Sequence, residues 1–195
     1  MNPGIEESRI NFCDRDILQD FMVKYRDLFW RSVSTYAANR SELHLKYWVS
    51  LSKGHARAST PTPRFLEQFS KRDLNDVYGV LDAQNGGKHW DSALCLWYVD
   101  DGKSQGMRLH RDHKTYSQGA TTINVIGSAE FLIKDSNDPK AKTSRYLLTE
   151  GSVIRFDNKR SHGVKLCSKE RAAIVLLNIK PEYKLDQTIK QLSLF

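Results

Sequence analysis

The chain has 195 residues, of which 39% are hydrophobic and 27% are charged, with a formal net charge of +7 and a pI near 9.3. This composition is typical of one soluble globular domain and excludes collagen-like, disordered and membrane-spanning classes. No apolar run approaches the roughly 18 residues of a membrane span, and no secretory apolar core is found at the N-terminus. The excess of positive charge favours a polyanionic partner, most simply nucleic acid.

The cysteines predict the compartment. Cys13, Cys95 and Cys167 are few, odd in number and widely separated, and none belongs to a Cys-x-x-Cys pair. Because disulfide frameworks use paired cysteines, we interpret these three as reduced thiols in the cytoplasm.

The first 90 residues predict helices. An apolar stripe at helical spacing covers residues 17–29, and Asp14 or Asp16 would be its N-cap. A second helical pattern would start at Pro63, and the Asn-Gly-Gly run at residues 85–87 would end it. Between the two helices we expect a short strand at residues 46–52, followed by a loop at residues 53–63 that is rich in Gly, Ser, Thr and Pro.

After residue 87 the pattern changes to short apolar segments separated by turn residues. These segments predict about eight strands, at residues 93–99, 107–110, 121–126, 130–133, 145–148, 152–156, 163–166 and 172–179. Residues 135–142 form a polar surface loop between two of them.

The predicted fold class is therefore α+β, mainly β: a double-stranded β-helix, or jelly roll, with N-terminal helices that cover one sheet. We divide the chain into an N-terminal helical support and substrate-recognition region (residues 1–90), a catalytic jelly-roll core (residues 91–180) and a C-terminal tail (residues 181–195). The three parts are expected to form one structural domain.

A His-x-Asp motif lies at His110 and Asp112, at the end of a predicted strand. Side chains two residues apart point to the same side of an extended strand, so both could bind one ion. Chance alone supplies about 0.5 such pairs in a chain with this content of His and Asp, and the motif by itself has little weight.

The order of several motifs along the chain is the stronger evidence for such a site. A Gly-led apolar strand at residues 151–157 precedes Ser161, His162 and Gly163, and Arg171 then opens the last strand, nine residues after His162. This order, after the His-x-Asp, resembles that of the Fe(II)/2-oxoglutarate-dependent dioxygenases over residues 93–179. Two imidazoles and one carboxylate also form the ligand set of a facial triad, which leaves open positions on a metal.

The resemblance implies a role for each of these residues. His110, Asp112 and His162 would bind Fe(II), and 2-oxoglutarate and dioxygen would take the remaining positions. Arg171 would bind the far carboxylate of 2-oxoglutarate, for which a planar guanidinium is well suited. Tyr98 and Asn124 are further candidates for binding the co-substrate.

The remaining histidines have ordinary interpretations. His113 faces away from Asp112 and would support the site or face the substrate. His44, His55 and His89 have no partners in sequence and are interpreted as surface residues.

The chain ends in a second motif, which resembles the peptide by which bacterial and phage proteins bind the replicative sliding clamp: Gln191, Leu192, Ser193, Leu194 and Phe195. Leu and Phe anchors would insert into an apolar pocket of the clamp while Gln binds at its rim. The alternative is that these apolar side chains pack on the domain itself. A clamp tether would raise the local concentration of the enzyme on DNA, in the cytoplasm of a bacterial or phage-infected cell.

We therefore expect the enzyme to hydroxylate or demethylate a base in DNA. Such a base must leave the stack, and the loop at residues 53–64 and the aromatic residues Trp90, Trp97 and Tyr98 would hold it. The AlkB-like dealkylases are similar in the region around Tyr98, but they usually carry a second Arg where this chain has Leu177. The TET/JBP-like pyrimidine hydroxylases are similar in the region after His110 and use one such Arg.

Two other functions stay open. A prolyl-hydroxylase-like oxygenase acting on a protein residue is supported by the spacing of residues 151–171. A non-catalytic clamp-binding module is the remaining alternative, and the complete triad argues against it.

Overall fold

The computed structural model describes residues 4–31, 36–37, 39–46, 48–52, 55–60, 66–100, 102 and 106–184, with the backbone alone at residues 48–52, 55–60 and 66. The clamp-like motif at residues 191–195 and part of the loop at residues 53–64 lie outside these described residues.

The described chain is mostly β-structure. Its α-helices are α1 (Phe12–Lys24) and α2 (Lys71–Gln84), and its short 3₁₀ helices are η1 (Arg26–Leu28), η2 (Leu66–Gln68) and η3 (Pro181–Tyr183). The strands are β1 (Glu6–Arg9), β2 (Trp30–Arg31), β3 (Arg40–Lys46), β4 (Trp48–Ser52), β5 (His55–Thr60), β6 (Ser92–Val99), β7 (Gly106–His110), β8 (Tyr116–Ile126), β9 (Ala129–Lys134), β10 (Thr143–Leu148), β11 (Ser152–Phe156), β12 (His162–Leu166) and β13 (Glu170–Ile179).

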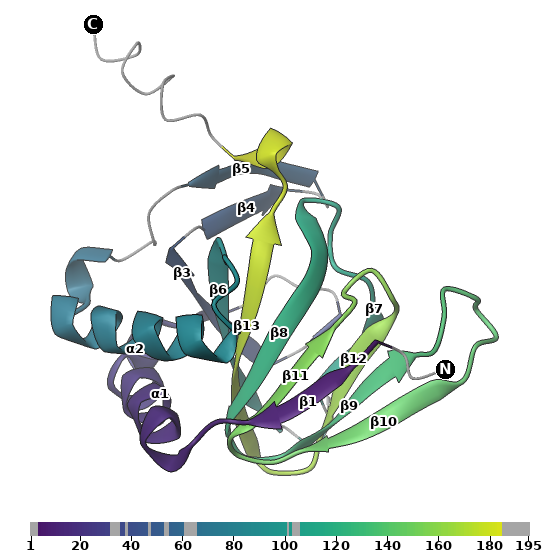
Figure 1. The fold of residues 1–195 in the computed structure, drawn as a ribbon, viewed down its shortest axis with the longest axis horizontal. Helices are drawn as coiled ribbons and strands as arrows, with labels where there is room; N and C mark the ends of the chain where they lie inside the picture. Colours follow the sequence, from purple (N-terminus) through teal and green to yellow (C-terminus); the bar gives the residue numbers. More distant parts are fainter. Residues whose placement is uncertain are drawn as a thin grey trace, which may run out of the picture.

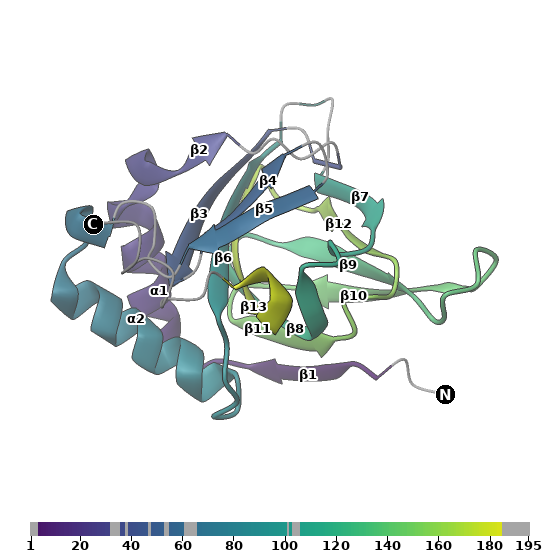
Figure 2. The same cartoon turned by 90° about the horizontal axis from the view of Figure 1, so that it is seen from above.

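Two antiparallel sheets form the body of the molecule (Figure 1). The larger has seven strands in the order β1-β11-β8-β13-β6-β3-β2, and the smaller has four in the order β10-β9-β12-β7. Figure 2 shows α1 and α2 on the side of the large sheet that faces away from the small one. Strands β6 to β13 correspond to the eight predicted strands, so the predicted jelly roll with helices covering one sheet is confirmed.

Side chains of the central strands point alternately to the two faces of the large sheet and build a core on each face. On β6, Cys95 and Trp97 pack in the cluster that contains α1 and α2, while Leu96 and Tyr98 pack against side chains of β7 and β12. Since successive side chains of a strand point to opposite faces, one strand serves both layers. The layer between the two sheets therefore forms a second interior, separate from the core under the helices.

The helix starts differ from the prediction. Asn11, and neither Asp14 nor Asp16, caps α1, because its side-chain oxygen accepts the Asp14 backbone N–H at 2.8 Å. Ser70 caps α2, which therefore begins at Lys71 and not at Pro63. The predicted end of α2 is confirmed, with Asn85 as C-cap and Gly86 following with φ +65°.

The N-terminal region contributes more strands than the sequence pattern predicted. β1 pairs with β11 and β3 pairs with β6, so the first 46 residues add both edges of the large sheet. The predicted loop at residues 53–63 contains β5, which pairs with β4 in a separate two-stranded sheet. In the described residues, α1 and α2 have 13 and 14 residues, and neither is long and apolar enough to cross a bilayer.

Candidate metal centre

The two histidines of the predicted triad lie opposite each other on neighbouring strands. His110 is the last residue of β7 and His162 is the first residue of β12, and the two are direct partners in the antiparallel register. Directly opposite residues in such a pair lie about 4.5–5.5 Å apart at Cα. Their imidazole centroids are 4.4 Å apart, so strand pairing alone brings together two residues separated by 52 positions in the sequence.

Backbone carbonyls fix the orientation of both rings. The Nδ1 of His110 lies 3.0 Å from the Arg108 carbonyl, and the Nδ1 of His162 lies 2.9 Å from the Arg160 carbonyl. Because a carbonyl only accepts, each Nδ1 must donate, and each neutral ring presents an Nε2 lone pair. This is the arrangement in which imidazole binds a metal while its other nitrogen is anchored.

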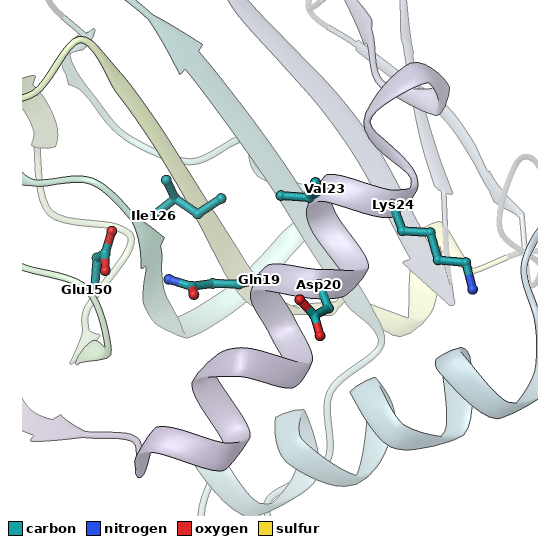
Figure 3. Close-up of a pocket in the computed structure, with 6 residues that line it drawn as sticks. All are labelled: Gln19, Asp20, Val23, Lys24, Ile126 and Glu150. Atoms are coloured by element: carbon teal, nitrogen blue, oxygen red, sulfur yellow. The ribbon is translucent and has the colours of Figure 1, made fainter.

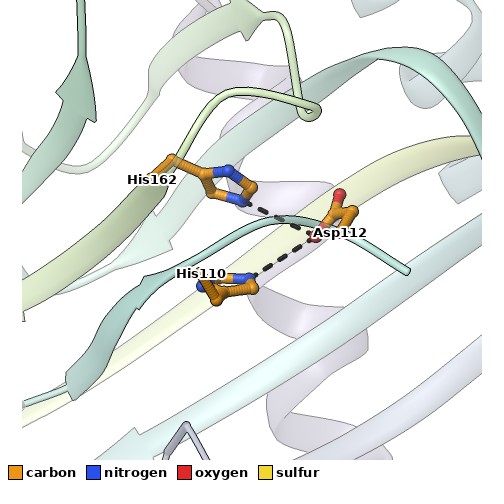
Figure 4. Close-up of side chains that lie close together, drawn as sticks. All are labelled: His110, Asp112 and His162. Carbon is orange, nitrogen blue, oxygen red and sulfur yellow. Dashed lines mark ion pairs between the residues drawn. The ribbon is translucent and has the colours of Figure 1, made fainter. Parts of the chain in front are cut away.

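The carboxylate of Asp112 completes the group (Figure 4). Its Oδ1 lies 3.5 Å from Nε2 of His110 and 3.6 Å from Nε2 of His162. Burial alone would raise the pKa of the Asp112 carboxyl, but the two imidazoles beside it lower this pKa overall to well below its ordinary value. The Asp112 carboxylate is therefore ionised at neutral pH and offers oxygen atoms to a metal.

The three residues fit a divalent metal. One ligand atom from each of His110, Asp112 and His162 lies within 4.8 Å of the other two. Two imidazole nitrogens and one carboxylate oxygen are the donor set of the iron facial triad, and no thiolate takes part. The structure thus brings together the three residues that the sequence predicted, although the role of each stays a prediction.

The predicted co-substrate residues form a second buried group. Nε of Arg171 donates to Oδ1 of Asn124 at 2.7 Å, and its guanidinium lies 5.5 Å from the centre of the Tyr98 ring. Asn124 is itself oriented, since its amide donates to the Gly127 carbonyl at 2.7 Å. The side chains of Arg171, Asn124 and Tyr98 are all at least 98% buried.

Arg171 is a buried cation without a carboxylate partner among the described residues. Burial lowers the pKa of its guanidinium, because a charge removed from water is destabilised. Asn124 accepts a hydrogen bond only from Nε of Arg171, so the two terminal nitrogens of the guanidinium are available to bind an anion. Tyr98 also reaches Met107 Sδ at 3.8 Å, and Met107 belongs to β7, the strand that ends in His110.

The sequence did not predict Asn158, which is fully buried behind Asp112. Its amide donates to Oδ2 of Asp112 at 3.1 Å, and its side-chain oxygen accepts the Gly119 backbone N–H at 3.0 Å. Asn158 lies 46 residues from Asp112, so no local spacing links the two. The only signal in the sequence was the position of Asn158, four residues before the distal histidine, His162.

The structure contradicts the expected exposure of the aromatic residues. Trp90, Trp97 and Tyr98 are exposed by 1%, 7% and 1%, so they cannot stack on an extruded base. Trp97 packs edge-on against Phe29 and beneath Arg26, on the helix side of the large sheet. The apolar character that made these residues candidates for stacking is used by the core.

Two of the other histidines can be placed. His44, expected at the surface, is 5% exposed and stacks on Trp30 with ring centroids 5.5 Å apart. His89 is exposed as expected and bonds Asp91 at 2.8 Å. His113 lies beside Asp112 and bonds the Thr115 hydroxyl at 2.6 Å, which is consistent with a supporting position. The side chain of His55 lies outside the described residues.

A pocket of about 640 Å³ lies beside α1 (Figure 3), and none of the three candidate metal ligands lines it. It is lined by residues of α1, by the end of β8 and by the turn between β10 and β11: Gln19, Asp20, Val23, Lys24, Ile126 and Glu150. None of these six is a predicted site residue, and the catalytic hypothesis does not involve this pocket.

Sequence comparison finds no matching protein family and no matching curated protein. Comparison of structures does find relatives of the fold. OsALKBH1 superposes with a TM-score of 0.61 at 15% identity, covering 91% of this chain and 99% of the other. A prolyl hydroxylase from Trichoplax adhaerens, in complex with a hypoxia inducible factor peptide, gives 0.64 at 11% identity, with coverages of 94% and 86%.

A prolyl-4-hydroxylase from Pseudomonas putida superposes with a TM-score of 0.51 at 9% identity, covering 91% of this chain and 93% of the other. At these identities the likeness concerns the fold. The chain has the jelly-roll fold of the 2-oxoglutarate oxygenases, and it carries a His-Asp-His group at the end of β7 and the start of β12 in the small sheet.

Proposed function

We propose that the protein is an Fe(II)- and 2-oxoglutarate-dependent dioxygenase that hydroxylates or demethylates a base in DNA. The observation that carries the oxygenase part is the convergence of His110, Asp112 and His162 inside a jelly roll of this class. Arg171, a buried cation in the same interior, supports a dicarboxylate as co-substrate.

The candidate residues form two groups, one for the metal and one for the co-substrate. His110 and His162 present neutral nitrogen donors and Asp112 an ionised oxygen donor, so the three would hold Fe(II) and leave its other positions open. Arg171 would neutralise the far carboxylate of 2-oxoglutarate, with Asn124 keeping the guanidinium in place. Iron, when bound, supplies the activation of dioxygen that protein side chains cannot provide.

The proposed reaction consumes 2-oxoglutarate and dioxygen and yields succinate, CO₂ and a hydroxylated substrate. Dioxygen takes up four electrons, two from the oxidative decarboxylation of 2-oxoglutarate and two from a substrate C–H bond. One oxygen atom enters the new carboxylate of succinate as CO₂ leaves, and the other converts the C–H group into C–OH. On an N-methylated base, the hydroxymethyl group would leave as formaldehyde and restore the N–H.

Charge and fold both support DNA as the substrate. The chain carries a net charge of +7, and the exposed side chains of Arg111 and Lys114 flank Asp112. Cations beside the reacting centre would contact phosphates on either side of an extruded base. OsALKBH1, whose name marks it as an AlkB homologue, shares the fold. Leu177 is buried in the core between the sheets, so one Arg alone would serve the co-substrate.

Mass spectrometry of nucleosides tests the substrate. We would incubate the protein with Fe(II), 2-oxoglutarate and oxygen on alkylated, methylated and unmodified DNA. A hydroxylated or demethylated nucleoside, absent with Asp112→Ala, supports the proposal. A product on a peptide and none on any DNA would contradict it.

A protein residue is the second candidate substrate. Two prolyl hydroxylases are among the structures with this fold, and one of them is in complex with a peptide. Prolyl-containing peptides therefore belong in the same assay, where hydroxylation adds one oxygen atom to the peptide mass.

Recruitment by the sliding clamp is proposed from the last five residues, Gln191 to Phe195. Removing them is expected to abolish binding to the clamp while activity on a short oligonucleotide stays unchanged. Unfolding of the truncated protein would show instead that these residues pack on the domain.

A further inference from the structure

The segment that connects β11 to β12 contacts two of the three candidate ligands. It comprises residues 157–161, and it passes behind Asp112 before the chain enters β12 at His162. Three of its residues, Asn158, Lys159 and Arg160, contact Asp112, His113 and His162 respectively, which makes the segment more than a connection between strands.

Asn158 holds Asp112 at two points. Its backbone carbonyl accepts the Asp112 N–H at 3.1 Å, and its side-chain amide donates to Oδ2 of Asp112, also at 3.1 Å. The opposite end of the Asn158 amide accepts the Gly119 N–H, which ties it to the start of β8. With no exposed surface, the Asn158 side chain has one orientation that satisfies both of these bonds.

The neighbours of Asn158 extend this support. Nζ of Lys159 donates to the carbonyl of His113 at 3.0 Å, so the residue after Asp112 is held as well. The Arg160 carbonyl accepts Nδ1–H of His162 and sets the direction of that ring. The segment therefore orients one oxygen and one nitrogen ligand together.

The consequence for Asp112 is a division between its two oxygens. Oδ2 is occupied by the Asn158 amide, while Oδ1 lies 3.5 and 3.6 Å from the two imidazole Nε2 atoms. We infer that Asn158 is a positioning residue that holds Asp112 as a ligand through one oxygen. This inference rests on the proposed metal site and adds a residue to it.

Asn158 would matter because ordering the Asp112 carboxylate for metal binding costs free energy. Asp112 lies beyond the end of β7 and has no strand hydrogen bonds of its own to fix it. Without the Asn158 amide, its carboxylate could rotate or take up water, and each metal-binding event would have to order it again. Supporting contacts of this kind change metal affinity by about 10–100-fold when they are removed.

Metal titration tests the inference without requiring turnover. We would titrate wild type, Asn158→Ala and Asn85→Ala with Co(II) and follow its visible absorption. Asn85 is the matched control, because it is a buried Asn at the C-cap of α2 whose amide makes comparable bonds to Thr121 and Lys88. Both variants are expected to lose similar stability, and only Asn158→Ala to lose about 10–100-fold in Co(II) affinity.

Three outcomes separate the possibilities. If wild type and Asn158→Ala bind Co(II) equally well, the positioning role is wrong while the metal site stands. If wild type itself binds no Co(II), the metal site fails and the positioning role fails with it. Should Asn158→Ala not fold, Asn158→Ser gives the same comparison, since its shorter side chain lacks the reach to Oδ2 and leaves the backbone bond to Asp112 intact.

Discussion

Replacing Arg171 with methionine should separate co-substrate binding from metal binding. The guanidinium is fully buried and its Nε bonds Asn124, so its terminal nitrogens are available for the far carboxylate of 2-oxoglutarate. Removing one partner of a buried charge pair costs about 3–5 kcal/mol. At about 1.4 kcal/mol per tenfold, the Kd for 2-oxoglutarate should rise by roughly 100–4,000-fold.

The stability of the free protein should respond differently. Methionine leaves the Asn124 oxygen without its donor, at a cost of about 1–3 kcal/mol. It also removes a buried charge that has no carboxylate partner among the described residues, and that removal is favourable. The two effects oppose each other, so the free energy of unfolding should fall by no more than the lost hydrogen bond.

Thermal unfolding in the presence of Mn(II) measures both effects. A ligand at about 100 times its Kd adds roughly 2.7 kcal/mol, which in a chain of this length corresponds to about 5–10 °C. Wild type should show this shift with 2-oxoglutarate and Arg171→Met should not, while both respond equally to Mn(II) alone. An unchanged 2-oxoglutarate shift in Arg171→Met would refute the assigned role.

Three further changes probe the strand contact at the site and the stability of the fold. Gly163→Ala should weaken metal binding, because an added Cβ would lie 2.7 Å from the Met107 carbonyl oxygen and push β12 away from β7. The control Gly79→Ala, where an added Cβ meets open space on α2, should instead stabilise the fold by about 0.5–1 kcal/mol. Metal titration and thermal unfolding of both variants compare the two effects. Asn11→Ala should cost about 1 kcal/mol in urea unfolding through loss of the α1 cap. Asp91→Asn should reduce the loss of stability in acid, which urea unfolding between pH 6 and pH 2 would measure.

The sign for Asp91 follows from its contacts. Burial alone would raise the pKa of the Asp91 carboxyl, but hydrogen bonds from Lys184, His89 and the Ile179 N–H lower it overall. A carboxyl group whose folded-state pKa lies below its unfolded value of about 3.9 stabilises the folded protein at pH values above about 3.9. This stabilisation is lost as the pH falls through the folded-state pKa. An acid profile identical to that of wild type in Asp91→Asn would show that this carboxylate does not contribute.

The catalytic half of the fold was predictable because its strands alternate clearly and end at turn residues. The register of β7 and β12, which places His162 opposite His110, was implied only by the order of the motifs. The resemblance carried the ligand roles, since each residue alone has an ordinary surface interpretation.

Apart from β4, which the sequence predicted as a strand at residues 46–52, the N-terminal strands and the contacts that support the candidate ligands were not predictable. β3 alternates Leu43 and Leu45 toward the helices with Arg40, Glu42 and His44 on its other face, and a charged face is read from sequence as solvent-exposed. In the structure Arg40 and Glu42 form an ion pair with little exposure. Long-range pairs such as this one, or Asn158 with Asp112, have no local spacing that would reveal them.

Conversion of 2-oxoglutarate to succinate tests the central claim most directly. Purified protein with Fe(II), 2-oxoglutarate and oxygen should form succinate, with a further increase when its substrate is added. His110→Ala and Asp112→Ala should reduce this conversion to background, because each removes one of the three candidate ligands. Unchanged succinate formation in either variant would contradict an iron centre at these residues.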